Sequence, residues 1–361
     1  MYINHRVAAL GAAATLSIGL LAGCGNSAAN GPMPAGSAAP GQADGKVHVV
    51  ASFYPMADFA GKVGGEHVVV TNLVPAGTEP HEWEPSPQDV AAIGDADLFV
   101  YNGAGMEGWV DDVLESIDTS QMQVVEASMG IELRAGGHDH DHDADDASEH
   151  AHGHDAEAAD AASERADSHD AEAADAASEH AHGHDGEHDP HVWLSPKNAR
   201  MELANIRDGL VKADPDHEAD YEANYEKYAQ QFEGLEREFS TRLAAAKGKA
   251  VVVSHEAYGY LCDAFGLEQM PIAGMDAEGE PDAQAMAQII DFVRANNVKT
   301  IFSEDLVSPK VAQAIADETG AACEQLSPLE GLTEEQLAAG EDYLSVMADN
   351  LDKLVAALNE E

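Results

Sequence analysis

The sequence predicts an α/β fold of two lobes, each with a mostly parallel four-stranded sheet flanked by helices, joined by one long helix. Two observations support this. Short apolar segments rich in valine alternate with helical segments in both halves of the chain, which is typical of parallel βαβ units. Between these halves, residues 214–247 carry apolar and aromatic residues at helical spacing and no proline after Pro215. The 361 residues also suit about two domains of ordinary size.

The first lobe is expected over residues 47–213. Apolar, β-branched segments predict its strands at 47–53, 67–74, 97–101 and 123–126. Helices are predicted between these strands at 55–63 and 108–117. Ser195 and Pro196 then begin a further helix, because serine caps a helix N-terminus and proline suits the first helical position.

The second lobe is expected over residues 248–361, after the long helix. A helix of about 30 residues is roughly 45 Å long, which is enough to run the height of a protein and join two lobes. Strands are predicted at 250–253 and 300–302, and helices at 257–265, 283–295 and 309–319. Thr333 and Gln336 form a capping box at the start of the last helix, whose leucines mark one apolar face.

The composition is strongly acidic. The chain has 18 lysines and arginines against 67 aspartates and glutamates, a formal net charge of −49. This argues against nucleic acid, because phosphate backbones require a basic surface, and against an anionic membrane surface as the main partner. It favours a cationic ligand. With 44% hydrophobic residues the chain can form a real core, and three cysteines are too few for a disulfide scaffold.

A low-complexity stretch at 138–190 interrupts the first lobe. It holds 18 acidic residues, one arginine and 11 of the 18 histidines, and it contains internal repeats. Because it lacks large apolar residues to pack, we expect a disordered surface loop. Histidine-rich tracts commonly bind metal, so the loop is a candidate for a weak secondary metal reservoir. The candidate ligands are His138, His140, His142, His150, His152, His154, His180, His182 and His184.

The N-terminal segment has the pattern of a lipoprotein signal. Residues 1–23 are a short basic start followed by an apolar run, which is typical of a signal peptide. The run ends in small residues before Cys24, which resembles a bacterial lipobox. Residues 24–46 would form the lipidated cysteine and a flexible tether. We therefore expect a protein anchored by lipid to the extracytoplasmic face of the cell membrane. Since no second long apolar run follows, the chain should not itself be a channel.

Two cysteines remain once Cys24 is lipidated. An extracytoplasmic setting would permit a disulfide between Cys262 and Cys323. Buried free thiols are the alternative.

Four residues at strand ends or in adjoining loops have side chains typical of a metal site. Ligands in open α/β sheets bind beyond the carboxyl ends of strands, and His255 and Glu304 directly follow predicted strands. Together with His81 and His191 they offer three imidazoles and one carboxylate, a four-coordinate set that suits Zn²⁺. Asp305 competes with Glu304 for the carboxylate position. Two ligands from each lobe would couple metal binding to lobe closure.

The segments around these four residues resemble a known family. They are PHEWEP at 80–85, DPHVWLSP at 189–196, SHEAYGY at 254–260 and EDLVSP at 304–309. In this order they look like the substrate-binding lipoproteins of zinc ABC importers, the ZnuA/AdcA-like family, and the likeness covers residues 46–358 apart from the acidic loop. The resemblance implies two α/β lobes joined by a long helix, with Zn²⁺ between them. It also implies an ABC permease and its ATPase in the membrane as partners, and a monomer.

Other functions stay open on the sequence alone. A manganese or iron carrier is the nearest alternative, but manganese-type relatives place glutamate at the position of His255 and aspartate at that of Ser308. A zinc-dependent hydrolase would fit an HExxH motif, yet the fourth residues after His81 and His255 are Pro85 and Gly259. An adhesin is the third alternative. We expect a zinc carrier that is not an enzyme.

Overall fold

A computed structural model describes residues 45–136, 188–275 and 277–359. The chain divides into two units, Met1–Pro40 and Gly41–Glu361, and the following description concerns the second. The expected signal peptide, Cys24 and the candidate loop histidines between 138 and 184 lie outside the described residues. Of the helices in the described ranges, none has the length and apolarity that a membrane span requires.

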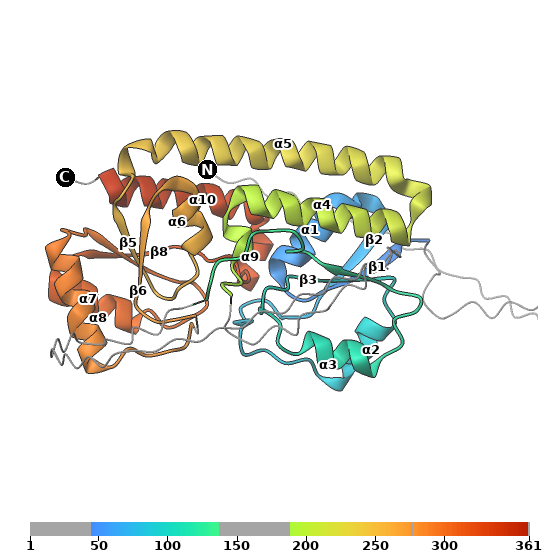
Figure 1. Cartoon of the computed structure of the whole chain (residues 1–361), viewed down its shortest axis with the longest axis horizontal. Helices are drawn as coiled ribbons and strands as arrows, with labels where there is room; N and C mark the ends of the chain where they lie inside the picture. The colour runs from blue at the N-terminus through green and yellow to red at the C-terminus, as the bar shows by residue number, and fades with distance from the viewer. Residues whose placement is uncertain (1–44, 137–187, 276, 360–361) are drawn as a thin grey trace, which may run out of the picture. The chain divides into compact units, whose positions relative to one another are not determined.

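The first lobe is built on one parallel sheet. Its strands are β1 (Val47–Ala51), β2 (Val68–Asn72), β3 (Leu98–Tyr101) and β4 (Gln123–Glu126), in the spatial order β2-β1-β3-β4. The helices between them are α1 (Tyr54–Gly64), α2 (Pro87–Gly94) and α3 (Val110–Ser116). Helices α2 and α3 pack on one face of this sheet and α1 on the other (Figure 1).

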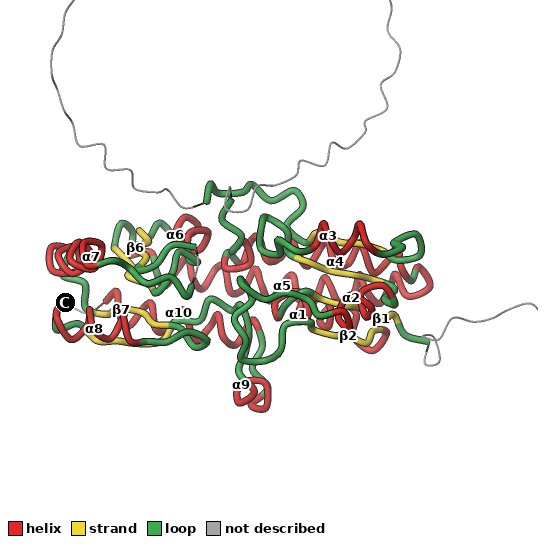
Figure 2. The backbone as a smooth tube through the Cα atoms, turned by 90° about the horizontal axis from the view of Figure 1, so that it is seen from below, coloured by secondary structure: helices red, strands yellow, loops and turns green. Residues whose placement is uncertain are grey.

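The second lobe repeats this topology. Its strands are β5 (Ala250–Val253), β6 (Glu268–Pro271), β7 (Thr300–Ser303) and β8 (Ala322–Gln325), all parallel, in the order β6-β5-β7-β8. The helices are α6 (Gly259–Phe265), α7 (Ala283–Ala295), α8 (Lys310–Thr319), α9 (Glu334–Ala339) and α10 (Tyr343–Asn359). Figure 2 shows the short helix α9 standing apart from both sheets.

Two long helices connect the sheets. Helix α4 (Pro196–Ala213) follows a 3-10 turn at Val192–Leu194, and α5 (Glu218–Arg242) follows a second turn at Pro215–His217. The helix expected over 214–247 is therefore a regular α-helix for 25 of those residues, with 3-10 turns on either side. Helix α5 contacts α1 and α4 of the first lobe and α10 of the second (Figure 1). The fold class predicted from the sequence is confirmed.

The central strands are largely continuous apolar runs because both of their faces are buried. In β5, Val251 and Val253 point into one hydrophobic cluster, whereas Val252 points into a second cluster beneath α7 and α8. The central strand β1 divides its valines in the same way. Because helices cover both faces of a parallel sheet, its central strands are continuous apolar runs rather than alternating ones.

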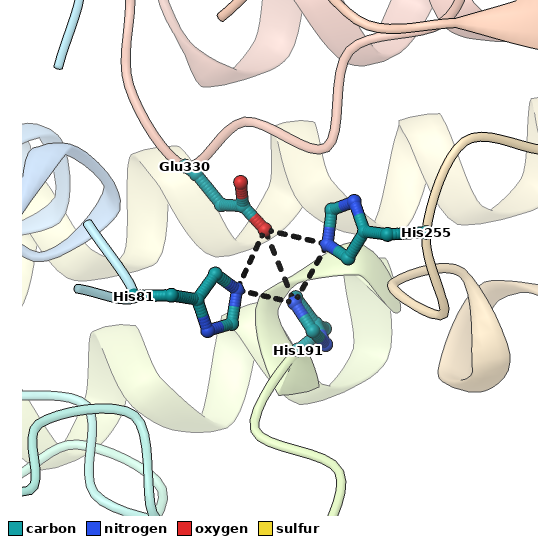
Figure 3. Close-up of side chains that lie close together, drawn as sticks. All are labelled: His81, His191, His255 and Glu330. Carbon is teal, nitrogen blue, oxygen red and sulfur yellow. Dashed lines mark hydrogen bonds and ion pairs between the residues drawn. The ribbon is translucent and has the colours of Figure 1, made fainter. Parts of the chain in front are cut away.

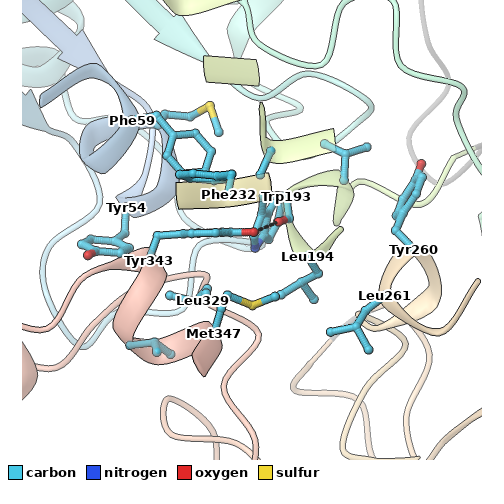
Figure 4. Packing of buried hydrophobic residues seen from close by; sticks show 14 of the residues in the cluster. Tyr54, Phe59, Trp193, Leu194, Phe232, Tyr260, Leu261, Leu329, Tyr343 and Met347 are labelled. Atoms are coloured by element: carbon cyan, nitrogen blue, oxygen red, sulfur yellow. Dashed lines mark hydrogen bonds between the residues drawn. The ribbon is translucent and has the colours of Figure 1, made fainter. Parts of the chain in front are cut away.

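The largest hydrophobic cluster contains side chains from both lobes, and we call it the shared core. Tyr343 of α10 stacks on Phe232 of α5 with ring centroids 4.9 Å apart and meets Phe59 of α1 edge-on at 5.1 Å. Its hydroxyl donates a hydrogen bond to the carbonyl oxygen of Trp193 at 2.6 Å (Figure 4). Burying a side chain of this size stabilises the fold by roughly 1.5–3 kcal/mol. The shared core therefore holds together the two lobes whose strand ends form the site.

Several sequence-based expectations were wrong or incomplete. Strands β6 and β8 were not predicted because both are edge strands whose sequences, EQMP and ACEQ, lack an apolar run; β6 is partly exposed and β8 largely exposed. The acidic loop was expected to reach residue 190, but its last residues belong to the fold. His188 pairs with Ala135 in an antiparallel bridge, and Asp189 is buried.

The proposed disulfide is absent, since Cys262 and Cys323 are both free thiols. Cys262 lies on α6 and is buried in the shared core. Cys323 lies in β8 and packs against the cluster beneath α7 and α8. The two thiols thus lie on opposite faces of the second sheet, which explains why they do not pair.

Candidate metal centre

Four side chains from distant parts of the chain converge between the lobes. His81 lies in the loop after β2, and His191 directly precedes the turn that leads into α4. His255 follows β5, and Glu330 lies in the segment after β8. Each lobe therefore contributes two residues, and their ring nitrogens and carboxylate point toward one another (Figure 3).

The spacing of the four ligand atoms fits a tetrahedral ion. The Nε2 atom of His191 lies 3.1 Å from that of His81 and 3.3 Å from that of His255. Oε1 of Glu330 lies 3.1–3.2 Å from all three of these nitrogens. Ligands about 2.0–2.1 Å from a tetrahedral Zn²⁺ are separated by about 3.3 Å. The four atoms already stand near the corners that such an ion requires.

The centre is almost fully buried. His191 and His255 are inaccessible to solvent and Glu330 is 1% exposed, whereas the side chain of His81 retains 14% exposure. His81 is therefore the member of the set that borders solvent. Unpaired buried charges are costly, so a buried carboxylate among three imidazoles requires a cation.

The pKa values of the buried carboxylate and imidazoles also indicate that the centre favours positive charge. Burial by itself would raise the pKa of Glu330, but the adjacent His255 charge and hydrogen bonds from the three imidazoles hold it well below its usual value. Burial opposes the charged form of His191 and His255, yet the neighbouring carboxylates raise the pKa of both imidazoles, that of His255 strongly. Protons therefore satisfy the carboxylates until a metal ion replaces them.

Two further carboxylates orient the buried imidazoles. Oδ1 of Asp189 lies 2.9 Å from Nδ1 of His191 and also accepts a hydrogen bond from the His191 backbone N–H at 3.0 Å. Oε1 of Glu304 lies 2.7 Å from Nδ1 of His255. A carboxylate beside Nδ1 fixes the proton there, which leaves the lone pair of Nε2 free for a metal.

The carboxylate of the set differs from the sequence expectation. Glu304 was expected as the fourth ligand, but it contacts the Nδ1 edge of His255, on the side of the ring away from the other imidazoles. Asp305, the alternative, instead accepts hydrogen bonds from Ser327 and Gln336. Glu330 occupies the fourth position. The sequence pattern does not reveal it, because β8 lacks an apolar run and no predicted strand end therefore precedes Glu330.

The segment that carries Glu330 is held from both lobes. The Trp193 indole N–H donates to the carbonyl oxygen of Pro328 at 2.8 Å, and the Tyr258 hydroxyl donates to that of Leu326 at 2.7 Å. Leu329, directly before Glu330, is fully buried and has a φ of 58°. A left-handed backbone is unfavourable for a branched residue, and such residues cluster at functional sites. The fold maintains this conformation, and it places the carboxylate between the lobes.

Comparison with known proteins places the chain in a family. Residues 49–357 match the family described as zinc-uptake complex component A, periplasmic. The chain belongs to this family. It is a component of a zinc uptake system, and zinc is the metal that the family description names. The expected zinc function is confirmed.

Individual relatives agree with this. The chain is 38% identical over 339 residues to the high-affinity zinc uptake system protein ZnuA of Bacillus subtilis, covering 94% of each chain. It is 36% identical over 320 residues to the zinc-binding lipoprotein AdcA of Streptococcus pneumoniae serotype 4, covering 89% of this chain and 57% of AdcA. The crystal structure of the Zn(II)-bound ZnuA-like domain of Streptococcus pneumoniae AdcA superposes with a TM-score of 0.68 at 33% identity. That match covers 88% of this chain and all of the domain.

Proposed function

We propose that His81, His191, His255 and Glu330 together bind one Zn²⁺ ion, which the chain captures outside the cell membrane and delivers to an ABC importer. The main support for this proposal is the convergence of three imidazole nitrogens and one carboxylate oxygen. These four atoms all lie within 4.8 Å of one another, and the carboxylate oxygen lies 3.1–3.2 Å from each nitrogen. Membership of the zinc-uptake family supports it independently.

The donor set favours zinc and carriage rather than catalysis. Imidazole suits Zn²⁺, whereas Mn²⁺ prefers sites dominated by oxygen ligands. Four protein ligands also fill the tetrahedral shell, whereas catalytic zinc sites usually keep one position open for water. With a closed shell, the bound ion is cargo held for release.

Release would follow from the division of ligands between lobes. His81 and His191 belong to the first lobe, and His255 and Glu330 to the second. Any movement that separates the lobes splits the shell into two pairs of ligands, neither of which holds the ion tightly. A membrane permease with its ATPase is the partner that would drive or exploit this separation. The carrier would act as a monomer, held to the extracytoplasmic face of the membrane by lipid at Cys24.

The test is the retention of zinc by the full-length protein against a chelator of known affinity. His191→Ala should lower the zinc affinity of the site by orders of magnitude. Its circular dichroism spectrum should stay that of the folded protein. His217→Ala is the matched control, because its partly exposed imidazole lies at the turn before α5 and belongs to none of the four candidate ligands. Equal retention of tightly bound zinc by both variants would contradict the proposed site.

A further inference from the structure

We propose that Arg134 is a positioning residue for the metal centre. It is expected to hold Asp189 behind the His191 imidazole and to lock this part of the first lobe against α6 of the second. The inference rests on the proposed zinc site, of which it names an additional determinant. Arg134 touches none of the four candidate ligands, so its effect would pass through Asp189.

The contact with Asp189 is direct. Nε of Arg134 lies 3.2 Å from Oδ2 of Asp189, whose other oxygen, Oδ1, lies 2.9 Å from Nδ1 of His191. The backbones of the two residues are also joined, since the Asp189 N–H donates to the carbonyl oxygen of Arg134 at 3.0 Å. One carboxylate thus joins the guanidinium to a candidate ligand. Asp189 is 1% exposed, so its charge needs a partner on both sides.

The other side of Arg134 contacts the second lobe. Its Nη1 donates to the carbonyl oxygen of Gly259 at 3.2 Å and forms an ion pair with Asp263, both on α6. The Tyr260 hydroxyl accepts a hydrogen bond from the Arg134 backbone N–H at 2.9 Å and donates one to the carbonyl oxygen of Asp189, also at 2.9 Å. Helix α6 begins four residues after His255. The cluster therefore joins the residue behind one candidate ligand to the helix that follows another.

The packing at Gly259 shows how closely these groups fit. A Cβ atom at this position would lie 2.5 Å from Nε of Arg134 and 2.6 Å from Oδ2 of Asp189. Any side chain there would force the guanidinium and the carboxylate apart or away from α6. Glycine is thus required at this position for the backbone to approach the ion pair.

The charge balance of the buried centre also favours an arginine at position 134. A bound Zn²⁺ carries two positive charges, and Glu330, Glu304 and Asp189 bring three negative charges into the buried centre. The guanidinium of Arg134 offsets one of these negative charges, that of Asp189. A guanidinium can also contact Asp189 and the α6 carbonyl at once, which a lysine ammonium does less well.

The experiment compares zinc affinity and metal-free stability in full-length variants. Arg134→Ala should weaken zinc binding about 10–100-fold, the usual effect of removing a group that supports a metal ligand. Gly259→Ala should reproduce this loss, and Arg134→Lys should restore part of it. Arg200→Ala is the control, because Arg200 is also a partly exposed first-lobe arginine, but it pairs with Glu233 and with none of these groups. The zinc affinity of this variant should stay within about threefold of the wild type.

Non-additivity separates positioning from general stability. In an Asp189→Asn background, Arg134→Ala should cause no further loss of zinc affinity, because the carboxylate through which it acts is already neutral. A lower melting temperature of metal-free Arg134→Ala with unchanged zinc affinity would overturn the inference, as would full additivity with Asp189→Asn. If His191→Ala also retained tightly bound zinc, the proposed site itself would be wrong. If His191→Ala lost zinc but the Arg134 and Gly259 variants retained it, the site would stand and only this inference would be refuted.

Discussion

The roles of Glu304 and Glu330 can be separated by two substitutions that preserve side-chain shape. Glu330→Gln removes a charged ligand whose oxygen lies 3.1–3.2 Å from three imidazole nitrogens. Glu304→Gln leaves the four candidate ligand atoms in place and weakens the contacts of Glu304 with Nδ1 and the backbone N–H of His255. The first change should therefore damage zinc binding far more than the second.

The size of the Glu304 effect follows mainly from its shorter hydrogen bond to His255, that to Nδ1. At 2.7 Å, its contact with His255 is a short bond to a charged acceptor in a buried setting. Such bonds contribute about 1.5–3 kcal/mol. Since about 1.4 kcal/mol corresponds to a tenfold change in affinity, Glu304→Gln should weaken zinc binding by about 10- to 150-fold.

Competition with a chromophoric chelator measures both variants on one scale. X-ray absorption of the zinc-loaded proteins then counts the ligands. We expect the wild type and Glu304→Gln to keep three nitrogens and one carboxylate oxygen, and Glu330→Gln to lose the carboxylate. If Glu304→Gln lost as much affinity as Glu330→Gln and also lost the oxygen ligand, the assignment of Glu330 would be refuted.

Three further outcomes are expected. Zinc affinity should fall as the pH falls, and the fall should begin above pH 6.5, because the pKa values of His191 and His255 are raised and protons compete for their nitrogens. Chelator competition from pH 8 to pH 5.5 measures this, and an affinity that did not change over this range would contradict it. Glu202 is fully buried without a hydrogen-bond partner, and burial raises its pKa well above 4.5. The folded state thus favours the neutral carboxyl, and the stability of the wild type should decline as the pH rises above 4.5. Glu202→Gln lacks this carboxyl, so its melting temperature should exceed that of the wild type by a margin that grows between pH 5 and pH 8. Iodoacetamide should label Cys323 before Cys262, since burial raises the pKa of the Cys262 thiol to about 12, and peptide mapping that found the two bridged would contradict this.

Local sequence patterns predict much of the fold. The valine-rich runs that became β1 and β5 are buried on both faces, and only central strands of a covered parallel sheet require such runs. His255 was found for the same reason, since it directly follows one of these runs. His81 and His191 stand in distinctive motifs, and the structure brings all three imidazoles together.

The choice of carboxylate was decided by tertiary structure alone. Glu304 and Glu330 both follow strands of the second sheet, and their local sequences do not show which one reaches the imidazoles. Glu304 leaves β7 beside β5 and meets the near edge of the His255 ring. Glu330 reaches the opposite edge from the segment after β8, in which the preceding residue, Leu329, has a left-handed conformation.

The contacts of that segment also come from far along the chain. Trp193 holds it from the first lobe and Tyr258 from the second. Arg134 is a comparable case, since its partners on α6 lie more than 120 residues away. Composition and periodicity determine which segments become strands and helices, because those depend on neighbours in sequence. Which carboxylate oxygen faces the three imidazoles depends on hydrogen bonds between segments that meet only after the lobes have packed.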